Sequence, residues 1–311
     1  MRILVATEDS LPTLAAIRFG ARLAAATGGE LLVLAIGNRF PHALAGSGGL
    51  DLRLASALNE AVRVSSANTL EQARTEAARL GARIRCESLR PRRVESIAET
   101  ISRTADRERA DLVVVGSRGG TAPARWALGS FASQLVHVVR RPVAVVPDSY
   151  QASARRVAKI VVATDGSKAA AEAVRFSARL AARIPHARLL VLTVSTLAAD
   201  LSLMGRRLVK ALGFGPELRR ADLHAARAIL DSAAREARRP GARVTLRHFV
   251  PRRPVFAAHA VASEAARQRA DLIVVGNSGR SSLGDAFLGS VAQRVVSLAR
   301  RPVVLVRARR R

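Results

Sequence analysis

A glycine loop of one fixed spacing occurs twice in this chain, each time directly after a strand-like run of Leu, Ile and Val. The two copies read Gly116-x2-Gly119-x9-Gly129-Ser130 and Gly276-x2-Gly279-x9-Gly289-Ser290. Glycines let a backbone adopt positive φ or come close to an anion, and a helix N-terminus offers unpaired N–H groups at the positive end of its dipole. A strand, a glycine loop and a helix that begins at Gly-Ser therefore predict phosphate binding.

Each motif residue also has an interpretation that needs no ligand. The first glycine of each loop could serve only as a tight turn. Ser130 and Ser290 could be N-caps of the helices that follow, since Ser290-x-x-Gln293 fits a capping box. One such loop alone would be weak evidence, but two intact copies with the same spacing favour phosphate binding.

The segments that position these loops recur in the same order in two halves of the chain. Four strand-like segments of the first half, 3–8, 31–34, 110–116 and 140–146, match 160–165, 189–192, 270–276 and 300–306 of the second. The polar stretch 147–156 between the halves carries no apolar periodicity. We therefore predict an internal duplication, with one domain at residues 1–150 and a second at residues 151–311.

The strand-like runs are short, continuous and rich in β-branched residues, as expected where helices cover both faces of a sheet. Helical stretches alternate with them at Ser10–Thr27, Asp51–Leu80, Arg93–Arg109, from Ser130, at Ser167–Ile184, Pro216–Arg239, Pro254–Arg269 and from Ser290. This alternation predicts an α/β fold in each half, with a parallel, doubly wound sheet and right-handed crossovers.

The composition is that of a globular protein. Hydrophobic residues make up 49%, in runs much shorter than the roughly 18 apolar residues of a membrane span. The first residues, MRILVATEDS, indicate a strand and not a signal peptide. The single cysteine, Cys86, excludes an intrachain disulfide, and its place in an alternating strand predicts a buried, inert thiol. We expect a cytoplasmic protein without membrane insertion.

The net charge of +27 is the most unusual property of the composition, and only three of the 51 basic residues are lysine. Such a preference for arginine is typical of codon bias in a GC-rich genome. The charge still predicts salt-sensitive attraction to polyanions, including nucleotides and nucleic acid. Aromatic residues make up only 3%, so bases would find few stacking partners, and we expect any nucleic-acid binding to be nonspecific.

The sequence lacks most catalytic motifs. It contains no GxxxxGK[ST] loop, no GxGxxG fingerprint, no GxSxG elbow and no SGGxDS loop of the kind that acts on ATP. Its six histidines form no HExxH motif and no i, i+4 pair, which argues against metal catalysis. We therefore predict a nucleotide binder that is not an enzyme, with any ATP hydrolysis slow and incidental.

On these motifs the chain resembles the universal stress protein family, in its tandem two-domain form and its ATP-binding branch. G-x2-G-x9-G-S after the fourth strand is that branch's signature, and the Arg-Pro-Val that begins at Arg141 and at Arg301 is also typical. The resemblance implies two tandem flavodoxin-like (Rossmann-like) domains, each with a five-stranded parallel sheet of order 3-2-1-4-5. It further implies pairing of the fifth strands, here Val143–Val146 with Val303–Val306 in an intrachain pseudo-dimer, or a homodimer of two chains.

The resemblance also implies ATP as the ligand, with or without Mg²⁺, and a role for each motif residue. Gly116 or Gly276 would lie against the adenosine. The phosphates would be held by backbone N–H groups and serine hydroxyls of Gly119, Gly129, Ser130, Gly279, Gly289 and Ser290. The acids at the ends of the first strands, Glu8 and Asp165, would contact the ribose. The backbone at the ends of the second strands, at Ile36 and Val194, would contact the adenine edge.

The second half is nearer the family pattern. Asp165 is the family's usual acid at the end of the first strand, whereas Glu8 is one methylene longer. The basic residue that commonly follows the second glycine is present only in the second loop, as Arg280. We therefore expect the better nucleotide site in the second half.

Two classes of function remain open at this point. The first is a cytoplasmic ATP-binding stress protein whose nucleotide state alters a surface that an unidentified protein partner reads. The second is a basic adaptor for nucleic acid or another polyanion, with vestigial nucleotide pockets, and a slow ATPase is a further alternative. Loss of nucleotide on bulky substitution at Gly279 or Gly289 would favour the first class.

Overall fold

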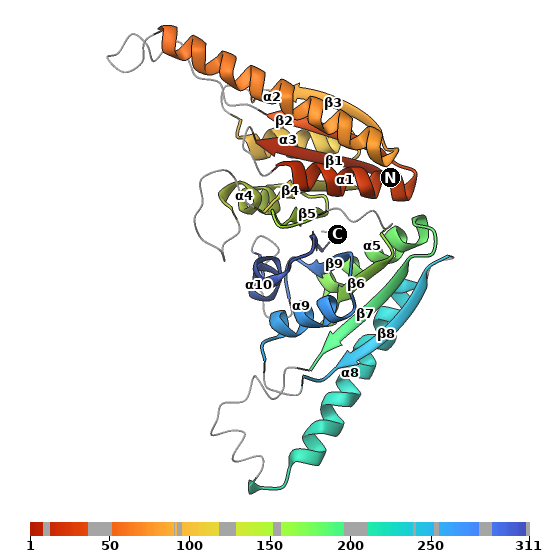
Figure 1. The fold of residues 1–311 in the computed structure, drawn as a ribbon. Coiled ribbons are helices and arrows are strands. Elements are labelled where there is room, and N and C mark those ends of the chain that lie inside the picture. Colours follow the sequence, from red (N-terminus) through yellow and green to blue (C-terminus); the bar gives the residue numbers. More distant parts are fainter. Residues whose placement is uncertain are drawn as a thin grey trace. The chain divides into compact units, whose positions relative to one another are not determined.

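The computed structural model describes residues 1–8, 13–36, 52–89, 91, 95–117, 129–151, 157–195, 211–238, 241–251, 255–279 and 288–308. The chain divides into two compact units, with the boundary between Ala154 and Arg155. Each unit is an α/β structure in which strands and helices alternate along the chain (Figure 1).

The first unit contains a parallel sheet of order β3-β2-β1-β4-β5. Its elements are β1 (Arg2–Glu8), α1 (Thr13–Thr27), β2 (Glu30–Ile36), α2 (Leu52–Leu80), β3 (Arg83–Leu89), α3 (Ile97–Arg107), β4 (Leu112–Gly116), α4 (Ser130–Val138) and β5 (Val143–Val146). Helix α1 packs against α2, and α3 packs against α4. The two helix pairs cover the two faces of the sheet, as right-handed crossovers require.

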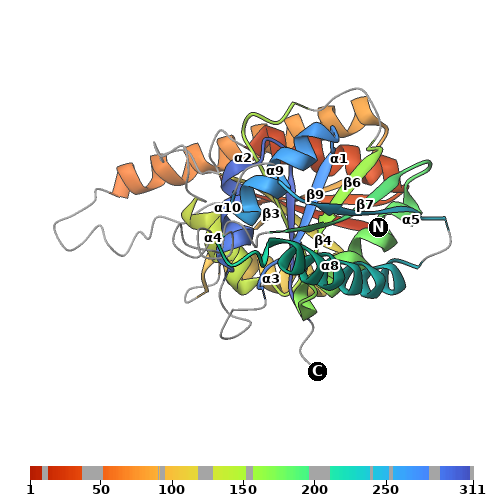
Figure 2. The ribbon, with the colours of Figure 1, turned by 90° about the horizontal axis from the view of Figure 1, so that it is seen from below.

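The second unit repeats this arrangement with a parallel sheet of order β8-β7-β6-β9-β10. Its elements are β6 (Lys159–Ala163), α5 (Lys168–Arg183), β7 (Arg188–Val194), α8 (Gly215–Ala237), β8 (Arg243–Phe249), α9 (Ala257–Arg267), β9 (Leu272–Gly276), α10 (Ser290–Leu298) and β10 (Val303–Val306). Helices α5 and α8 pack together, as do α9 and α10, and Figure 2 shows the two pairs apart. Numbered within each unit, both sheets have the predicted order 3-2-1-4-5, so the flavodoxin-like fold is confirmed.

The apolar strands form the core of each sheet because helices shield them on both faces. Every residue of β4 and β9 before the final glycine is buried, and so is every residue of β5 and β10. The edge strands β3 and β8 are half-exposed. Cys86 lies on β3, so it is half-buried and not buried as predicted, although burial does raise the pKa of its thiol.

Helix α3 begins later than the sequence pattern indicates. The predicted helix started at Arg93, but the structure begins α3 at Ile97 because Ser96 forms a capping box with Glu99. The Ser96 hydroxyl accepts the Glu99 N–H at 3.2 Å, and the Glu99 carboxylate accepts the Ser96 N–H at 2.8 Å. A reciprocal pair of this kind fixes the first turn more strongly than apolar spacing does.

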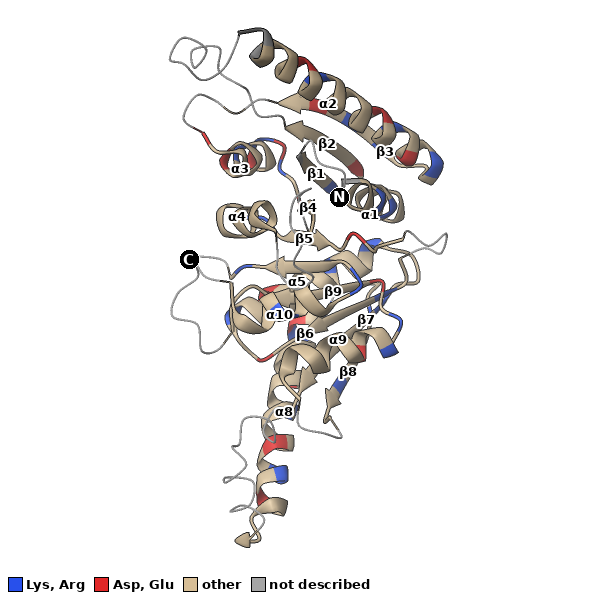
Figure 3. Cartoon of the chain, turned by 60° about the vertical axis from the view of Figure 1, so that its left-hand side comes forward, with Lys and Arg blue, Asp and Glu red and all other residues tan. Residues whose placement is uncertain are grey.

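Basic side chains are spread over many elements of both units. Figure 3 shows Lys and Arg on helices and strands of each unit, interspersed with Asp and Glu. None of the helices in the described part of the chain has the length and apolar character of a membrane span. The described charges thus form no single basic stripe of the kind that marks a nucleic-acid-binding face.

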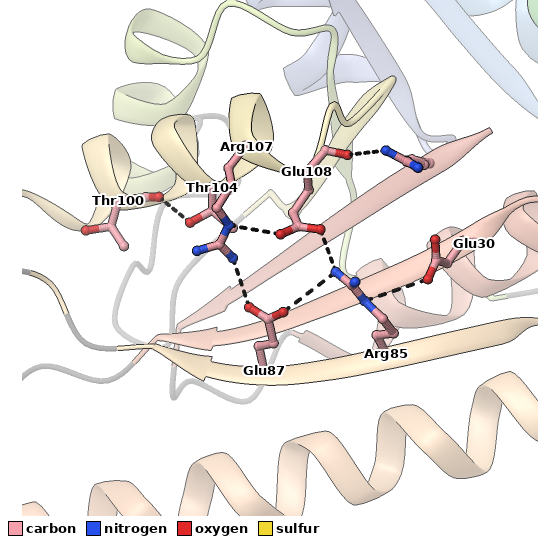
Figure 4. A network of polar contacts seen from close by, with 8 residues as sticks. Glu30, Arg85, Glu87, Thr100, Thr104, Arg107 and Glu108 are labelled. Atoms are coloured by element: carbon pink, nitrogen blue, oxygen red, sulfur yellow. Dashed lines mark hydrogen bonds and ion pairs between the residues drawn. The ribbon is translucent and has the colours of Figure 1, made fainter.

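Charged side chains of the first unit tie its edge strand to a helix end (Figure 4). Arg85 on β3 donates to Glu108 at 2.6 Å and lies 3.7 Å from Glu30 on β2. Arg107 donates to Glu108 at 2.9 Å and to Glu87 at 3.2 Å. Hydrogen bonds from Arg85 and Arg107 hold the pKa of Glu108 below its usual value. Because β3 has a neighbour strand on one side only, these contacts help fix its position.

Tyr150 anchors the end of the first unit onto helix α1. Its ring packs edge-on against Phe19 with centroids 5.8 Å apart, and its hydroxyl accepts a hydrogen bond from Arg22 Nη1 at 3.0 Å. We expect Tyr150→Phe to lower the free energy of unfolding by about 1–2 kcal/mol, because the ring remains but a buried guanidinium loses one acceptor. Urea denaturation measures this change, and an unchanged midpoint would contradict it.

Candidate functional site

Both glycine loops are closed by the same pair of backbone hydrogen bonds. In the second unit the Asn277 N–H donates to the Val306 carbonyl at 2.8 Å, and the Gly289 N–H donates to the Asn277 carbonyl at 2.7 Å. The equivalent bonds of the first unit join Ser117 to Val146 at 2.8 Å and Gly129 to Ser117 at 2.9 Å. Each loop is therefore held between the end of the last strand and the start of the last helix.

The N-cap of the last helix of each unit is a glycine and not a serine. Gly129 is the N-cap of α4 and Gly289 is the N-cap of α10, and neither helix start has a capping side chain. The capping-box interpretation of Ser290 is therefore wrong, since Ser290 is already the first helical residue. The first N–H groups of both helices lack intrahelical acceptors, as in any helix, and no side-chain cap occupies them.

The loop glycines are explained by close approach and not by positive φ. Gly129 and Gly289 have φ of −56° and −62°, so neither uses the positive φ that glycine allows. A Cβ at Gly276 would lie 2.8 Å from the backbone of Ala169 and Ala170 at the start of α5. A Cβ at Gly279 would lie 3.2 Å from a side-chain oxygen of the strand-end acid of β6. The chain packs too closely at Gly276 for a larger residue, whereas at Gly279 the neighbour is the end of a side chain.

These groups surround a cavity of about 690 Å³ in the second unit. The cavity lies at the carboxyl ends of β6, β7 and β9 and at the start of α10, where open α/β sheets bind ligands. All six residues that the sequence singled out in this half line it: Asp165, Val194, Gly276, Gly279, Gly289 and Ser290. The volume is within the range of roughly 300–1,000 Å³ that is usual for small-molecule sites.

The corresponding residues of the first unit occupy the same places in its fold. Ile36 ends β2, Gly116 ends β4, and Gly129 and Ser130 begin α4. The backbone of Glu8 ends β1, opposite Ile36. The side chain of Glu8, Gly119 and Arg280 lie outside the described residues.

The cavity wall is mostly apolar, with polar groups at defined points. Asp165 accepts the N–H of Ser167 at 2.9 Å through Oδ1, and its Oδ2 faces Gly279. Among the described residues that line the cavity, the ionisable side chains are those of Asp165, Asp222 and His248, with no lysine or arginine. An anion bound there would therefore be held by backbone N–H groups at α10 and not by a cationic side chain of the described lining.

A polar cluster of the cavity was missed from the sequence: Ser195 after β7, Asp222 on α8 and His248 on β8. The three residues are far apart along the chain and form no motif, so spacing could not reveal them. One signal was available, because His248 is the second-to-last residue of β8, near the edge where ligands bind.

Two serines at helix starts of the second unit, Ser167 and Ser290, give a testable contrast. The Ser167 hydroxyl caps α5 by accepting the Ala170 N–H at 3.2 Å, whereas Ser290 caps nothing. We expect Ser167→Ala to lower the free energy of unfolding by about 1 kcal/mol and Ser290→Ala by less than about 0.5 kcal/mol. Urea denaturation of both variants measures the difference, and equal losses would contradict these cap assignments.

The sequence matches the universal stress protein family over residues 1–147, 157–212 and 255–307. A universal stress protein of Mycolicibacterium smegmatis is 31% identical over 217 residues, which are 70% of this chain and 68% of that protein. The chain belongs to the universal stress protein family. The crystal structure of a universal stress protein from Archaeoglobus fulgidus superposes on 99% of this universal stress protein and 98% of its own chain, with a TM-score of 0.64 and 18% identity.

The structural likeness to the Archaeoglobus protein spans both units, so the tandem fold is shared over the whole chain. A universal stress protein solved in complex with cAMP is 24% identical, covers 49% of this chain and 98% of its own, and has a TM-score of 0.32.

Proposed function

We propose that this universal stress protein binds ATP, with or without Mg²⁺, in the cavity of its second unit. The observation that carries the proposal is the convergence of strand-end acid, glycine loop and uncapped helix start on one cavity. These are the elements that a nucleotide needs: an acceptor for ribose hydroxyls, a close backbone and N–H donors for phosphate.

The phosphates would lie at the start of α10. The N–H groups of Ser290 and Val291 belong to the first turn of that helix, and the hydroxyl of Ser290 adds a further donor. Hydrogen bonds that involve a charged group contribute about 1.5–3 kcal/mol each. Three or four of them, less the cost of binding, account for a micromolar Kd, which is about −8 kcal/mol.

The ribose would lie between Asp165 and the glycine loop. The Asp165 carboxylate is oriented by the Ser167 N–H and faces Gly279, so it is positioned before a ligand arrives. The backbone of Val194 lines the same cavity and would contact the adenine edge. A pre-positioned acceptor lowers the entropic cost of binding.

We propose a regulatory role without strong catalysis. Ser195 donates to Asp222 and not to His248, whereas the hydroxyl of an activated serine nucleophile donates to a histidine. In this proposal the nucleotide state alters a surface that an unidentified protein partner reads in the cytoplasm. Pairing of the fifth strands, within one chain or in a homodimer, remains a prediction.

The first test is to identify what the purified protein carries. The protein is purified in high salt, stripped of RNA and denatured, and the released small molecules are identified by chromatography and mass spectrometry. We expect adenine nucleotide at one or two equivalents per chain. No released nucleotide, followed by no calorimetric response to Mg-ATP, would contradict the proposal.

The net charge of +27 favours a second candidate, a polyanion adaptor. Its binding to nucleic acid would be salt-sensitive and indifferent to substitution of the cavity glycines. ATP binding that depends on Gly279 separates the two candidates.

A further inference from the structure

The polar cluster of Ser195, Asp222 and His248 lies in the wall of the cavity. The Ser195 hydroxyl donates to Asp222 Oδ2 at 2.5 Å. His248 Nε2 lies 3.7 Å from the same oxygen. The side chains of Asp222 and His248 are only 23% and 15% exposed, so most of each is removed from water.

His248 Nε2 is buried and has no hydrogen-bond partner among the described residues. A separation of 3.7 Å is too long for a hydrogen bond to Asp222. Buried polar nitrogens are almost always hydrogen-bonded, since an unmade bond costs free energy. An unpaired nitrogen beside a cavity therefore marks a place where an incoming group can bond.

The chemistry of the cluster restricts what that group can be. A carboxylate only accepts hydrogen bonds, while the imidazole nitrogen donates when it carries the proton. Asp222 and His248 thus offer an acceptor and a donor side by side, and the Ser195 hydroxyl orients the acceptor. The complementary ligand is a flat group with an N–H next to an acceptor nitrogen.

The walls near the cluster suit an aromatic ring. Leu192, Ala226 and Ile229 line the same cavity. Apolar walls with a few placed polar groups are typical of sites that bind flat heterocycles. The amino group and adjacent ring nitrogen of adenine provide the N–H and the acceptor that the cluster lacks.

The first unit does not share the cluster. Ser88 is the second-to-last residue of β3, where β8 has His248. When the two units are aligned on Gly81 and Gly241, the glycines that follow their long helices, the first unit has Val62 where the second has Asp222. The fold repeats without the acid and the histidine, so the fold alone does not require them.

We propose that Asp222 and His248 determine base specificity in the second unit by reading the amino edge of adenine, with Ser195 as a positioning residue. The inference rests on the proposed function, because it assigns a role within the same nucleotide site. Inosine triphosphate is the informative competitor, since its base carries a carbonyl oxygen in place of the amino group. That oxygen would face the Asp222 carboxylate, and two acceptors repel each other.

The test compares the Kd of ATP and of inosine triphosphate by calorimetry in the wild-type protein, in Asp222→Asn and in Asp231→Asn. Asp231 is an exposed acid on the same helix, so its substitution makes the same charge change away from the cavity. We expect the wild-type protein and Asp231→Asn to favour ATP by about tenfold or more. In Asp222→Asn the preference should fall to about twofold or less, because the asparagine amide can donate to the carbonyl oxygen.

A second measurement reports on His248 itself. In protein labelled with ¹⁵N-histidine, the His248 signal, assigned with His248→Gln, should shift on addition of ATP. Binding of ATP without a shift of that signal, together with an unchanged preference in Asp222→Asn, would overturn the inference and leave the proposed function standing. No binding of either nucleotide would overturn both.

Discussion

Replacing Gly279 with leucine is expected to weaken ATP binding by about a hundredfold or more, which is about 2.7 kcal/mol, while the fold is retained. Gly279 lines the cavity, and the nearest neighbour of a Cβ there would be Asp165 Oδ2 at 3.2 Å. The leucine side chain would therefore fill the space between the strand-end acid and the start of α10. Its backbone has no positive φ, so the substitution introduces no backbone strain.

Gly279 is a cleaner probe than the other loop glycines. A Cβ at Gly276 would collide with backbone of α5 at 2.8 Å, and one at Gly289 would lie 3.3 Å from the Asn277 carbonyl. Both substitutions would disturb the framework as well as the cavity. At Gly279 the neighbour is the end of a side chain, which can shift by a few tenths of an ångström.

Gly215→Leu is the matched control. Gly215 is the first residue of α8 and does not line the cavity, and the nearest atom to a Cβ there would be Arg219 Nη1 at 3.5 Å. Calorimetry with Mg-ATP should give a wild-type Kd for this control. If Gly279→Leu binds ATP as well as the control does, the cavity is not the nucleotide site.

The duplication made the fold predictable from the sequence. Each half supplied an independent copy of the same strand and helix order, and the continuous apolar strands indicated a sheet covered on both faces. Local hydrogen bonds were less predictable. The start of α3 depends on Ser96 and Glu99, and apolar spacing alone placed that helix start too early.

The candidate site was predictable only where it is local in sequence. The glycine loop and the start of α10 are continuous in the sequence, so spacing predicted them, while the family resemblance supplied Asp165, which lies two residues after β6. Asp222 and His248 lie near Ser195 only in the folded protein, where β7 and β8 end at one edge of the sheet and α8 runs beside that edge. Side-chain clusters of this kind need the tertiary structure.

Glu264 on α9 is the most completely buried acid in the described part of the chain, with none of its side chain exposed. It accepts hydrogen bonds from Arg267 at 2.7 and 2.8 Å and from Gln268 at 2.8 Å, and Arg247 of the edge strand β8 lies 3.1 Å away. Burial raises the pKa of Glu264, but the bonds from Arg267 and Gln268 and the charge of Arg247 outweigh it. The pKa therefore lies below its usual value.

We expect Glu264→Ala to lower the free energy of unfolding of the second unit by about 1–2 kcal/mol, because it removes the hydrogen bonds of a buried carboxylate, while its arginine partners reach solvent. A carboxyl group with a lowered pKa in the folded state stabilises that state above its unfolded pKa of about 4.3. The stabilisation is lost as the pH falls through the folded pKa. The difference in free energy of unfolding between the wild type and Glu264→Ala should therefore be largest above about pH 5 and become smaller below about pH 4.

The exposed pair of Glu71 and Arg74 provides the control, since its side chains are 70% and 55% exposed at an N–O distance of 3.0 Å. Glu71→Ala should cost less than about 0.5 kcal/mol at any pH, because water and salt already screen that pair. Urea denaturation at pH 7 and at about pH 3 measures both variants. Equal, small losses for the two variants would mean that Arg247 and Arg267 are solvated well enough without the carboxylate, and that the ion pairs of Glu264 do not stabilise the second unit.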